Sequence, residues 1–399
     1  MDTRKPVNTS TARCEITLST HLVQFVRDYF GTRDFIPLHA PTFSGREKEY
    51  VVDTIESTFV SSVGTFVDRF ERDMANYTGS PRAVATVNGT AALHVGLKLA
   101  GVESGDLVVT QPLTFVATCN AIAYCNAEPV FVDVDRDTLG LSPAALEAWL
   151  DENAQVDAQG VCRTKLDGRA IRACVPMHTF GHPADLDGLC RVTRRWNIHM
   201  VEDAAESLGS FYKGQHTGTF GEIGTLSFNG NKIMTTGGGG MILSGEAAAD
   251  RAKHLTTTAK KPHTYEYVHD EVGYNYRLPN LNAALGCAQL EQLESFIKAK
   301  RALATAYEIF FKGDSLQFVK EPAGCRSNYW LNAVICDSKQ HRDSLLESTN
   351  KEGIMTRPIW ALMNHLAMYQ NCRRGDLSNA QWLEERVVNI PSSVVLARP

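Results

Sequence analysis

The feature that most constrains the fold is a regular alternation of apolar strands with helix-forming segments between Asn88 and Asn229. The strand-like runs are separated by segments whose apolar residues recur every three to four positions. In order along the chain these runs are DLVVT, PVFVDV, AIRACVP, IHMVED and GTLSFN. Strands that are apolar throughout and separated by helices are typical of a parallel sheet covered on both faces. We therefore predict an α/β fold whose ligands bind beyond the carboxyl ends of the strands.

The flanking regions divide the 399 residues into three predicted parts. Residues 1–34 are predicted to be an N-terminal extension with a short helical pattern, and residues 35–260 to contain the large sheet domain. After this point a long helix, predicted over residues 280–301, leads into a mixture of strands and helices. Residues 261–399 are therefore predicted to form a smaller α+β domain, and the chain is long enough for both cores.

Composition argues against several classes of function. The formal net charge of −5 gives no support to nonspecific nucleic-acid binding, which requires a basic face. No apolar run reaches the roughly 18 residues of a membrane span, and the first twenty residues lack the apolar centre of a secretory signal. The ten cysteines are scattered singly, without the spacing of a zinc or iron–sulfur site. We expect a cytoplasmic protein with reduced thiols, no bound metal and no membrane partner.

Two short motifs follow predicted strands, where a parallel-sheet site would place them. Gly89, Thr90 and Ala91 open a helix, and the N–H groups at a helix N-terminus beside a threonine hydroxyl can hold a phosphate. An N-cap threonine after a turn glycine would give the same pattern. Asp203 ends an apolar strand, where an unpaired carboxylate is costly to bury. A protonated pyridine nitrogen would suit it as a partner, whereas a helix cap or a structural ion pair would explain it equally well.

A third motif places Lys232 between the strand that ends near Ser227 and the glycine run Gly237–Gly240. A nucleophilic lysine must lose its proton, which burial or a nearby cation favours. Ser227 could donate to a phosphate, and glycines allow close backbone approach. A solvated surface lysine is the ordinary alternative. A dinucleotide fingerprint fits poorly, because the glycines precede the strand-like MILS.

Together with the loop motif GYNYR, these motifs resemble the DegT/DnrJ-type nucleotide-sugar aminotransferases, which are fold-type I pyridoxal phosphate (PLP) enzymes. The resemblance runs from Ile36 to Pro391. It rests on PTFSGREKEYV, VNGTAALHVGL, QPLTFVATCNAI, VEDAAESLGS, LSFNGNKIMTTGGGGMI and GYNYRLPNLNAALGCAQLEQL. It implies a PLP-dependent transferase with a mostly parallel central sheet, helices on both faces and a smaller C-terminal α+β domain.

The resemblance also implies roles for individual residues. Lys232 resembles the lysine that binds PLP as a Schiff base and carries the proton during transamination. Asp203 is similar to the partner of the pyridine nitrogen, and Phe115 to the aromatic residue that stacks on the ring. The residues that resemble the phosphate-binding set are Gly89, Thr90, Ala91 and Ser227.

Two further residues carry specific expectations. Asn275 resembles the asparagine that reaches the phosphate from the opposite subunit, which implies a homodimer with shared active sites. Glu206 stands where many relatives have glutamine, and a carboxylate near the ring would repel negative charge unless it is protonated or paired. We therefore expect Glu206 either to have a raised pKa or to point toward the incoming sugar.

The implied reaction moves an amino group from L-glutamate, which leaves as 2-oxoglutarate, to a nucleotide-linked keto sugar with ping-pong kinetics. The motifs SFNGNKIMTTGGGG and EDAAESLGS are similar to those of enzymes that aminate carbon 4 of a UDP-linked 2-acetamido-4-keto-6-deoxyhexose. Those enzymes supply bacillosamine, legionaminic acid and similar surface polysaccharide sugars. GDP-4-keto-6-deoxymannose, the perosamine route, and dTDP-linked keto sugars remain open.

Three other functions fit only part of this pattern. A PLP-dependent sugar dehydratase would carry histidine at the position of Lys232. A noncatalytic sugar-binding relative would not need Lys232, Asp203 and Ser227 together. A Rossmann-type oxidoreductase is suggested only by the parallel sheet and the glycine run. Several other polar and aromatic residues are expected to be structural or stay unassigned: His178, His182, His216, Tyr329, Trp330, Arg357, Trp360 and His365.

Overall fold

The protein is built around a seven-stranded sheet in a computed structural model that describes residues 9–396, with side chains from residue 18 onward. The strand order is β1-β11-β10-β7-β6-β2-β3. Neighbours pair in parallel except around β11, which is antiparallel to both β1 and β10. The strands are β1 (Arg82–Thr86), β2 (Leu107–Thr110), β3 (Glu128–Phe131), β6 (Ile171–Val175), β7 (His199–Asp203), β10 (Ile223–Ser227) and β11 (Gly240–Ser244). The predicted mostly parallel sheet is confirmed, although the sequence reading missed β1.

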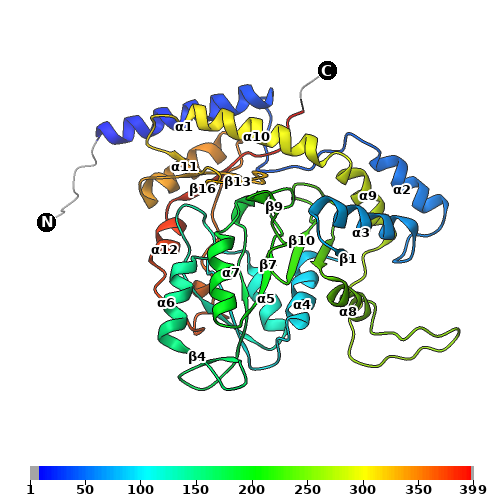
Figure 1. The fold of residues 1–399 in the computed structure, drawn as a ribbon. Helices are drawn as coiled ribbons and strands as arrows, with labels where there is room; N and C mark the ends of the chain where they lie inside the picture. The colour runs from blue at the N-terminus through cyan, green and yellow to red at the C-terminus, as the bar shows by residue number, and fades with distance from the viewer. Residues whose placement is uncertain (1–8, 397–399) are drawn as a thin grey trace.

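Helices cover both faces of this sheet, as predicted (Figure 1). Successive side chains of a strand point to opposite faces, so Val108 packs with one helix layer and Val109 with the other. One layer consists of α4 (Gly89–Leu99), α5 (Val116–Tyr124) and α8 (Glu246–Thr256). The other consists of α3 (Thr65–Thr78), α6 (Pro143–Asn153), α7 (Leu186–Arg195) and α9 (Asn280–Leu290).

Local sequence explains where several of these helices begin. Ser142 caps α6 by accepting a bond from the backbone N–H of Ala145 at 3.4 Å, and Pro143 follows at the first helical position. Asp185 caps α7 in the same way. At α4 the capping residue is Asn88, whose Oδ1 accepts from the N–H of Ala91 at 2.8 Å. The threonine that follows is therefore free of the capping role.

A second, antiparallel sheet lies in the C-terminal part of the chain, with the order β12-β14-β16-β15. Helices α1 and α10 pack on it side by side through Phe25, Tyr307 and Phe310 (Figure 1). Residues 1–8 of the predicted N-terminal extension lie outside the described residues. The elements of this region are α1 (Thr9–Phe30), α10 (Leu293–Phe310), β12 (Gln317–Phe318), β14 (Asn332–Ile335), α11 (Lys339–Lys351), β15 (Arg357–Pro358), α12 (Ser378–Glu384) and β16 (Val387–Ile390).

The single helix predicted over residues 280–301 is wrong in one respect, because the chain forms two helices that meet at Glu291 and Gln292. The change of direction allows α9 to pack against α2 (Glu47–Glu56) and α3, while α10 packs with α1. Tertiary packing thus overrides a continuous helical pattern. The remaining short elements are β4 (Ala154–Val156), β5 (Cys162–Thr164), η1 (Thr179–Gly181), β8 (Phe211–Tyr212), β9 (Gln215–His216), β13 (Cys325–Arg326) and η2 (Met363–His365).

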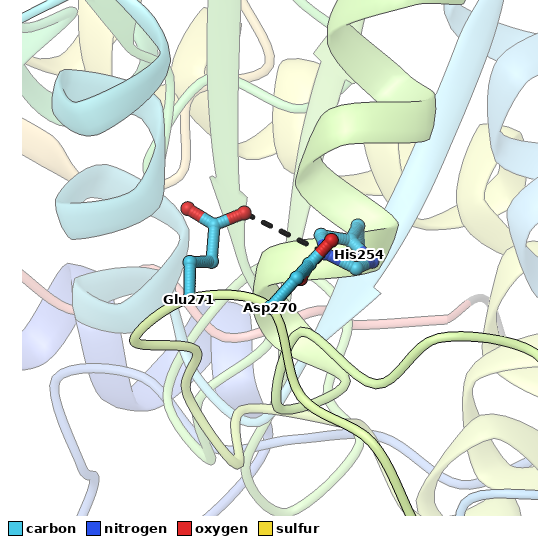
Figure 2. Close-up of side chains that lie close together, drawn as sticks. All are labelled: His254, Asp270 and Glu271. Atoms are coloured by element: carbon cyan, nitrogen blue, oxygen red, sulfur yellow. Dashed lines mark hydrogen bonds and ion pairs between the residues drawn. The ribbon is translucent and has the colours of Figure 1, made fainter.

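The long loop between α8 and α9 projects away from the body of the molecule (Figure 1). Its base is tied to α8, because His254 Nε2 lies 2.8 Å from Asp270 Oδ1 and 3.5 Å from Glu271 Oε1 (Figure 2). Arg251 Nη2 also donates to Glu271 at 2.6 Å, so the guanidinium group of Arg251 already neutralises part of the charge of the Asp270–Glu271 pair. Within residues 9–396, no helix is both long and apolar enough to span a membrane.

Candidate active site

Strands β7 and β10 and the start of α4 open into a cavity of about 250 Å³. Seven of the predicted site residues line it together: Gly89, Thr90, Phe115, Asp203, Glu206, Ser227 and Lys232. Ala91 and Asn275, which were also predicted, are not among the lining residues. The cavity therefore lies at the carboxyl ends of β7 and β10, where an open α/β sheet is expected to bind its ligand.

One end of the cavity has the features of an anion seat. Gly89 begins α4, and the first N–H groups of a helix have no partner within the helix. A Cβ at Gly89 would lie 2.8 Å from the Cβ of Ser227, so glycine allows this close approach. Gly240 pairs with Ser227 across the sheet, and a Cβ there would lie 2.5 Å from the backbone carbonyl of Asn88. The glycine run thus lets the helix start and the Ser227 hydroxyl converge.

Asp203 lies at the end of β7 and is 3% exposed. Its Oδ2 accepts a hydrogen bond from Thr118 Oγ1 at 2.7 Å, and its Oδ1 accepts from the N–H of Ala205 at 3.2 Å. Burial raises the pKa of this carboxyl above its ordinary value. These two neutral donors use only part of the lone pairs of the carboxylate. Its oxygens can therefore accept a further hydrogen bond from a cationic N–H group in the cavity.

Glu202, the preceding residue, points into the protein behind the cavity. It accepts hydrogen bonds from the backbone N–H groups of Gly218, Phe220 and Gly221 at 2.6–2.7 Å. His178 Nε2 donates to it at 3.1 Å, because His178 Nδ1 is engaged by the N–H of Ala184. As expected of a structural histidine, His178 is fully buried; His182 and His216 are buried as well.

Lys232 reaches into the cavity, with its side chain 12% exposed. Its Nζ lies 3.2 Å from Glu206 Oε1 and 4.0 Å from the ring centroid of Trp330. Trp330 Nε1 donates to the carbonyl of Asn231 at 2.7 Å, which orients the indole. Contact with an aromatic face is favourable for a cationic amine. The C-terminal region thus contributes directly to the surroundings of this lysine.

Glu206 is buried, with its side chain 2% exposed. Its second oxygen, Oε2, accepts from the backbone N–H of Phe180 at 2.9 Å. Phe180 has φ of 58°, a backbone conformation that is uncommon outside glycine. Burial raises the pKa of Glu206 to about 7, although the positive charge of Lys232 opposes that rise. The expectation of a raised pKa therefore agrees with the geometry.

The remaining predicted residues lie at the edge of the site or away from it. Phe115 is 51% exposed at the cavity rim, just before α5. Ala91 uses its N–H to satisfy the cap of α4. Asn275 is exposed near the base of the projecting loop, where its Oδ1 accepts from Arg277 Nη2 at 3.0 Å. Within one chain, Asn275 is therefore not part of the cavity wall.

Comparison with known proteins decides the family. The DegT/DnrJ/EryC1/StrS aminotransferase family profile matches residues 41–398. The chain belongs to this family. It is 39% identical over 327 residues to EpsN of Bacillus subtilis, provisionally described as a pyridoxal phosphate-dependent aminotransferase, and the match covers 82% of this chain and 81% of EpsN.

Other members have a named product or a solved structure. The GDP-perosamine synthase of Escherichia coli O157:H7 is 34% identical over 359 residues, which cover 90% of this chain and 93% of that enzyme. The crystal structure of the aminotransferase TlmJ from Streptoalloteichus hindustanus superposes with a TM-score of 0.81 at 28% identity, covering 90% of this chain and 93% of TlmJ. The protein is therefore a sugar aminotransferase of the DegT/DnrJ/EryC1/StrS family and not a Rossmann-type oxidoreductase.

Aminotransferases of this family depend on PLP, and the cavity residues fit that cofactor. The start of α4 and Ser227 would bind its phosphate, and buried Asp203 would accept a hydrogen bond from its ring N–H. Lys232, which also lines the cavity, would supply a primary amine for its aldehyde. These three functions occur in one cavity, as cofactor binding requires.

Sequence reasoning missed two aromatic residues of the site. Trp330 packs in the core as expected, but it also lines the cavity, as does Trp360, for which the sequence predicts no role. Neither stands beside a recognisable motif, because the segments that carry them meet the cavity only through tertiary folding. Arg357 and His365, which were also left unassigned, are not among the lining residues.

Proposed function

We propose that the enzyme transfers the amino group of L-glutamate to carbon 4 of a nucleotide-linked 4-keto-6-deoxy sugar. Family membership supports the amino transfer and the class of acceptor. The observation that carries the proposal is that Lys232 Nζ, Asp203 and the anion seat at Gly89 face one cavity. A lysine beside a buried aspartate and a helix N-terminus has the position required to hold PLP and to move a proton at its Nζ atom.

The cavity residues divide this work. When bound, PLP supplies an electron sink for the carbon atom that loses a proton. Gly89 and Thr90 would bind its phosphate with their N–H groups, assisted by the hydroxyl of Ser227. Two donors, Thr118 Oγ1 and the N–H of Ala205, hold the carboxylate of Asp203 in place, and this carboxylate would accept the hydrogen bond of the ring nitrogen. Phe115, at the rim, would cover one face of the ring.

Two candidate acceptors have independent support. The relative named GDP-perosamine synthase supports GDP-4-keto-6-deoxymannose. The motif around Lys232 and the EDAAESLGS segment support a UDP-linked 2-acetamido-4-keto-6-deoxyhexose of the kind that leads to bacillosamine or legionaminic acid. The two acceptors share the 4-keto-6-deoxy sugar and differ in the nucleotide and in the substituent at carbon 2.

A spectroscopic screen tests the proposal. Enzyme converted to its amine-loaded form with L-glutamate is mixed with GDP-, UDP- and dTDP-linked keto sugars, and the spectrum of the aldehyde form of the cofactor is followed. We expect one 4-keto-6-deoxy sugar to restore that spectrum and to yield an amino sugar by mass spectrometry. Failure of every sugar, with L-glutamate still accepted, would refute the acceptor. A deoxygenated product without nitrogen would instead indicate a dehydratase.

We also propose a homodimer in which Asn275 completes the site of the partner. The projecting loop exposes apolar and aromatic side chains, with Tyr265 and Tyr267 each 80% exposed, and Phe59 and Val63 are exposed elsewhere on the surface. Large exposed apolar side chains favour an interface between subunits. Asn275 itself is exposed and outside the cavity of its own chain.

Mixed dimers test the shared site. Lys232→Ala and Asn275→Asp subunits should each be inactive alone, since one lacks the reactive amine and the other places a negative charge beside the phosphate. After subunit exchange, one site of each mixed dimer carries both native residues, so about a quarter of the wild-type activity should return. Analytical ultracentrifugation gives the mass, and no recovery in confirmed mixed dimers would refute sharing.

The proposed cellular setting is the cytoplasm, in the supply of amino sugars for surface polysaccharides. Eight of the described cysteines are free thiols, which suits a reducing compartment: Cys119, Cys125, Cys162, Cys174, Cys190, Cys287, Cys325 and Cys372. Fractionation of the native host with an antibody to the enzyme checks the compartment.

A further inference from the structure

Glu206 has a place in the cavity that the functions assigned so far do not use. Its Oε1 lies 3.2 Å from Lys232 Nζ, and its Oε2 is held by the N–H of Phe180. Each oxygen thus has a different partner, and one of the two faces the reactive amine. The side chain lines the cavity while being almost fully shielded from solvent.

Amino transfer poses a problem of proton balance at this position. An amino acid reaches the enzyme at neutral pH with its amine protonated, and an ammonium nitrogen has no lone pair with which to form a bond. The donor nitrogen must come close to Lys232 Nζ, because both amines react at the same cofactor atom. A proton acceptor within hydrogen-bond reach of that place would therefore allow the donor to react.

We propose that Glu206 is this acceptor: its Oε1 takes a proton from the ammonium group of the incoming amino donor. One N–H bond breaks, one O–H bond forms, and the electron pair stays on the donor nitrogen as a lone pair. The carboxylate becomes a carboxylic acid and the ammonium becomes a neutral amine, so net charge is conserved. The inference rests on the amino transfer proposed above and adds a catalytic residue to it.

Geometry selects Glu206 among the nearby carboxylates. Both oxygens of Glu202 are engaged by backbone N–H groups, and the residue does not line the cavity. Asp203 lines the cavity but is held by Thr118 and is assigned to the cofactor ring. Only Glu206, of the carboxylates that line the cavity, has an oxygen directed at the reactive amine.

The electrostatic surroundings suit reversible protonation near neutral pH. The charged groups that act on Glu206 are Lys232, which lowers its pKa, and Asp203, which raises it. Burial is the largest influence and brings the pKa to about 7, so both protonation states are accessible at physiological pH. The N–H of Phe180 fixes the carboxyl group in either state. A base with a pKa near the working pH is the most effective for proton transfer.

The first test needs no cofactor and no turnover. Cofactor-free protein labelled with ¹³C at the glutamate carboxyl carbon is titrated by NMR. We expect one carboxyl signal that titrates near pH 7, that is absent from Glu206→Gln, and that titrates at higher pH in Lys232→Ala, where a positive charge is removed. If the signal lost in Glu206→Gln titrates in the ordinary range for glutamate, the proposal is wrong.

The second test follows the half-reaction with L-glutamate in single turnovers of the PLP-loaded enzyme. Near neutral pH, Glu206→Gln should react on the order of 100-fold more slowly than wild type. The difference in rate between Glu206→Gln and wild type should shrink as the pH rises, because solvent then removes the donor proton. The rise in rate near pH 7 that the wild type shows should be absent from the Glu206→Gln profile. Glu206→Asp should recover part of the rate.

Asp135→Asn is the matched control, because Asp135 is a partly buried carboxyl outside the cavity whose pKa burial also raises. It should react like wild type. A Glu206→Gln variant that is equally slow at every pH would show a positional role and overturn the proposal, as would one with the wild-type profile. If wild type itself binds PLP but does not react with amino donors, the proposed function fails instead.

Discussion

Glu202 and Glu206 are buried carboxylates only four residues apart, yet they lie in opposite settings. Glu202 points away from the cavity and accepts from three backbone N–H groups and from His178. Glu206 points toward the cavity and has one backbone donor and one lysine. Burial alone would raise both pKa values, but the donors around Glu202 hold its pKa below the ordinary value, whereas that of Glu206 rises to about 7.

The difference shows that burial does not decide what a carboxylate does. The number of fixed donors decides whether it stays ionised and holds the fold, or whether it can exchange a proton. Glu202 ties β7 to the segment 218–221 and thereby fixes the backbone that carries Asp203. The structural carboxylate behind the strand therefore supports the chemical groups in front of it.

The largest effect should come from removing the amine that faces Glu206. Lys232→Ala should lower transamination by a factor on the order of 10²–10⁴ or more, because the proton carrier is lost together with the point of attachment. Activity with the preferred sugar and borohydride labelling followed by peptide mapping would measure this. Lys298→Ala, at an exposed lysine of α10, should be fully active. Substantial turnover by the Lys232 variant would remove the assignment.

The next largest effect should be a difference in unfolding free energy between variants at the two carboxylates. Glu202→Gln should lower the free energy of unfolding by about 3 kcal/mol, since it disrupts a fully buried network around a charged acceptor. Glu206→Gln should be at least as stable as wild type at neutral pH, because an amide can still accept from Phe180 and no charge is buried. Urea titrations of the cofactor-free proteins compare them. Equal losses at both positions would contradict the distinction.

The pH dependence of stability should have opposite signs at the two sites. The folded-state pKa of Glu206 is raised, so rising pH between about 4.5 and 7 favours the unfolded state, by as much as about 3 kcal/mol. The pKa of Glu202 is lowered, so its contribution is present above the unfolded value and is lost as pH falls through the folded value. Unfolding curves of wild type and of each Glu→Gln variant, measured from well below pH 4.5 to above pH 7, would separate the two contributions.

A smaller effect is expected at the aromatic face beside Lys232. Trp330→Phe keeps an aromatic ring but removes the indole N–H bond to the carbonyl of Asn231. We expect a loss of about 1 kcal/mol in unfolding free energy and a modest change in cofactor affinity. Fluorescence titration with PLP and urea unfolding would measure both, with Trp382→Phe, outside the cavity, as the control. A loss of several kcal/mol would mean that Trp330 is chiefly a core residue.

Much of the fold could be predicted from the sequence because its signals are local. Strands β2, β3, β6, β7 and β10 each contain an apolar run, and Ser142-Pro143 marks the start of α6 by its own chemistry. The break at Glu291 could not be read, because it depends on packing against α2 and α3, which lie more than 200 residues earlier in the chain. The domain boundaries at residues 34 and 260 remain predictions.

The candidate site divides in the same way. Lys232, Asp203 and Gly89 follow strands directly, so their convergence at one sheet edge was predictable. Trp330 and Trp360 reach the cavity from the C-terminal region, and no pattern around them indicates that contact. The environment of Glu206 depends on the N–H of Phe180, whose left-handed backbone conformation only the folded chain reveals.

The reversed strand β11 has a consequence for how variation in this chain should be interpreted. Gly240 starts β11 directly beside Ser227 and beneath the Asn88 carbonyl, and even a methyl group there would collide with backbone. In a library of single substitutions scored for function, Gly240 should therefore tolerate as few replacements as Lys232, although Gly240 carries no reactive atom. Separating the two requires scoring abundance alongside activity: intolerance at Gly240 would be shared by both scores, whereas at Lys232 it would appear in activity alone.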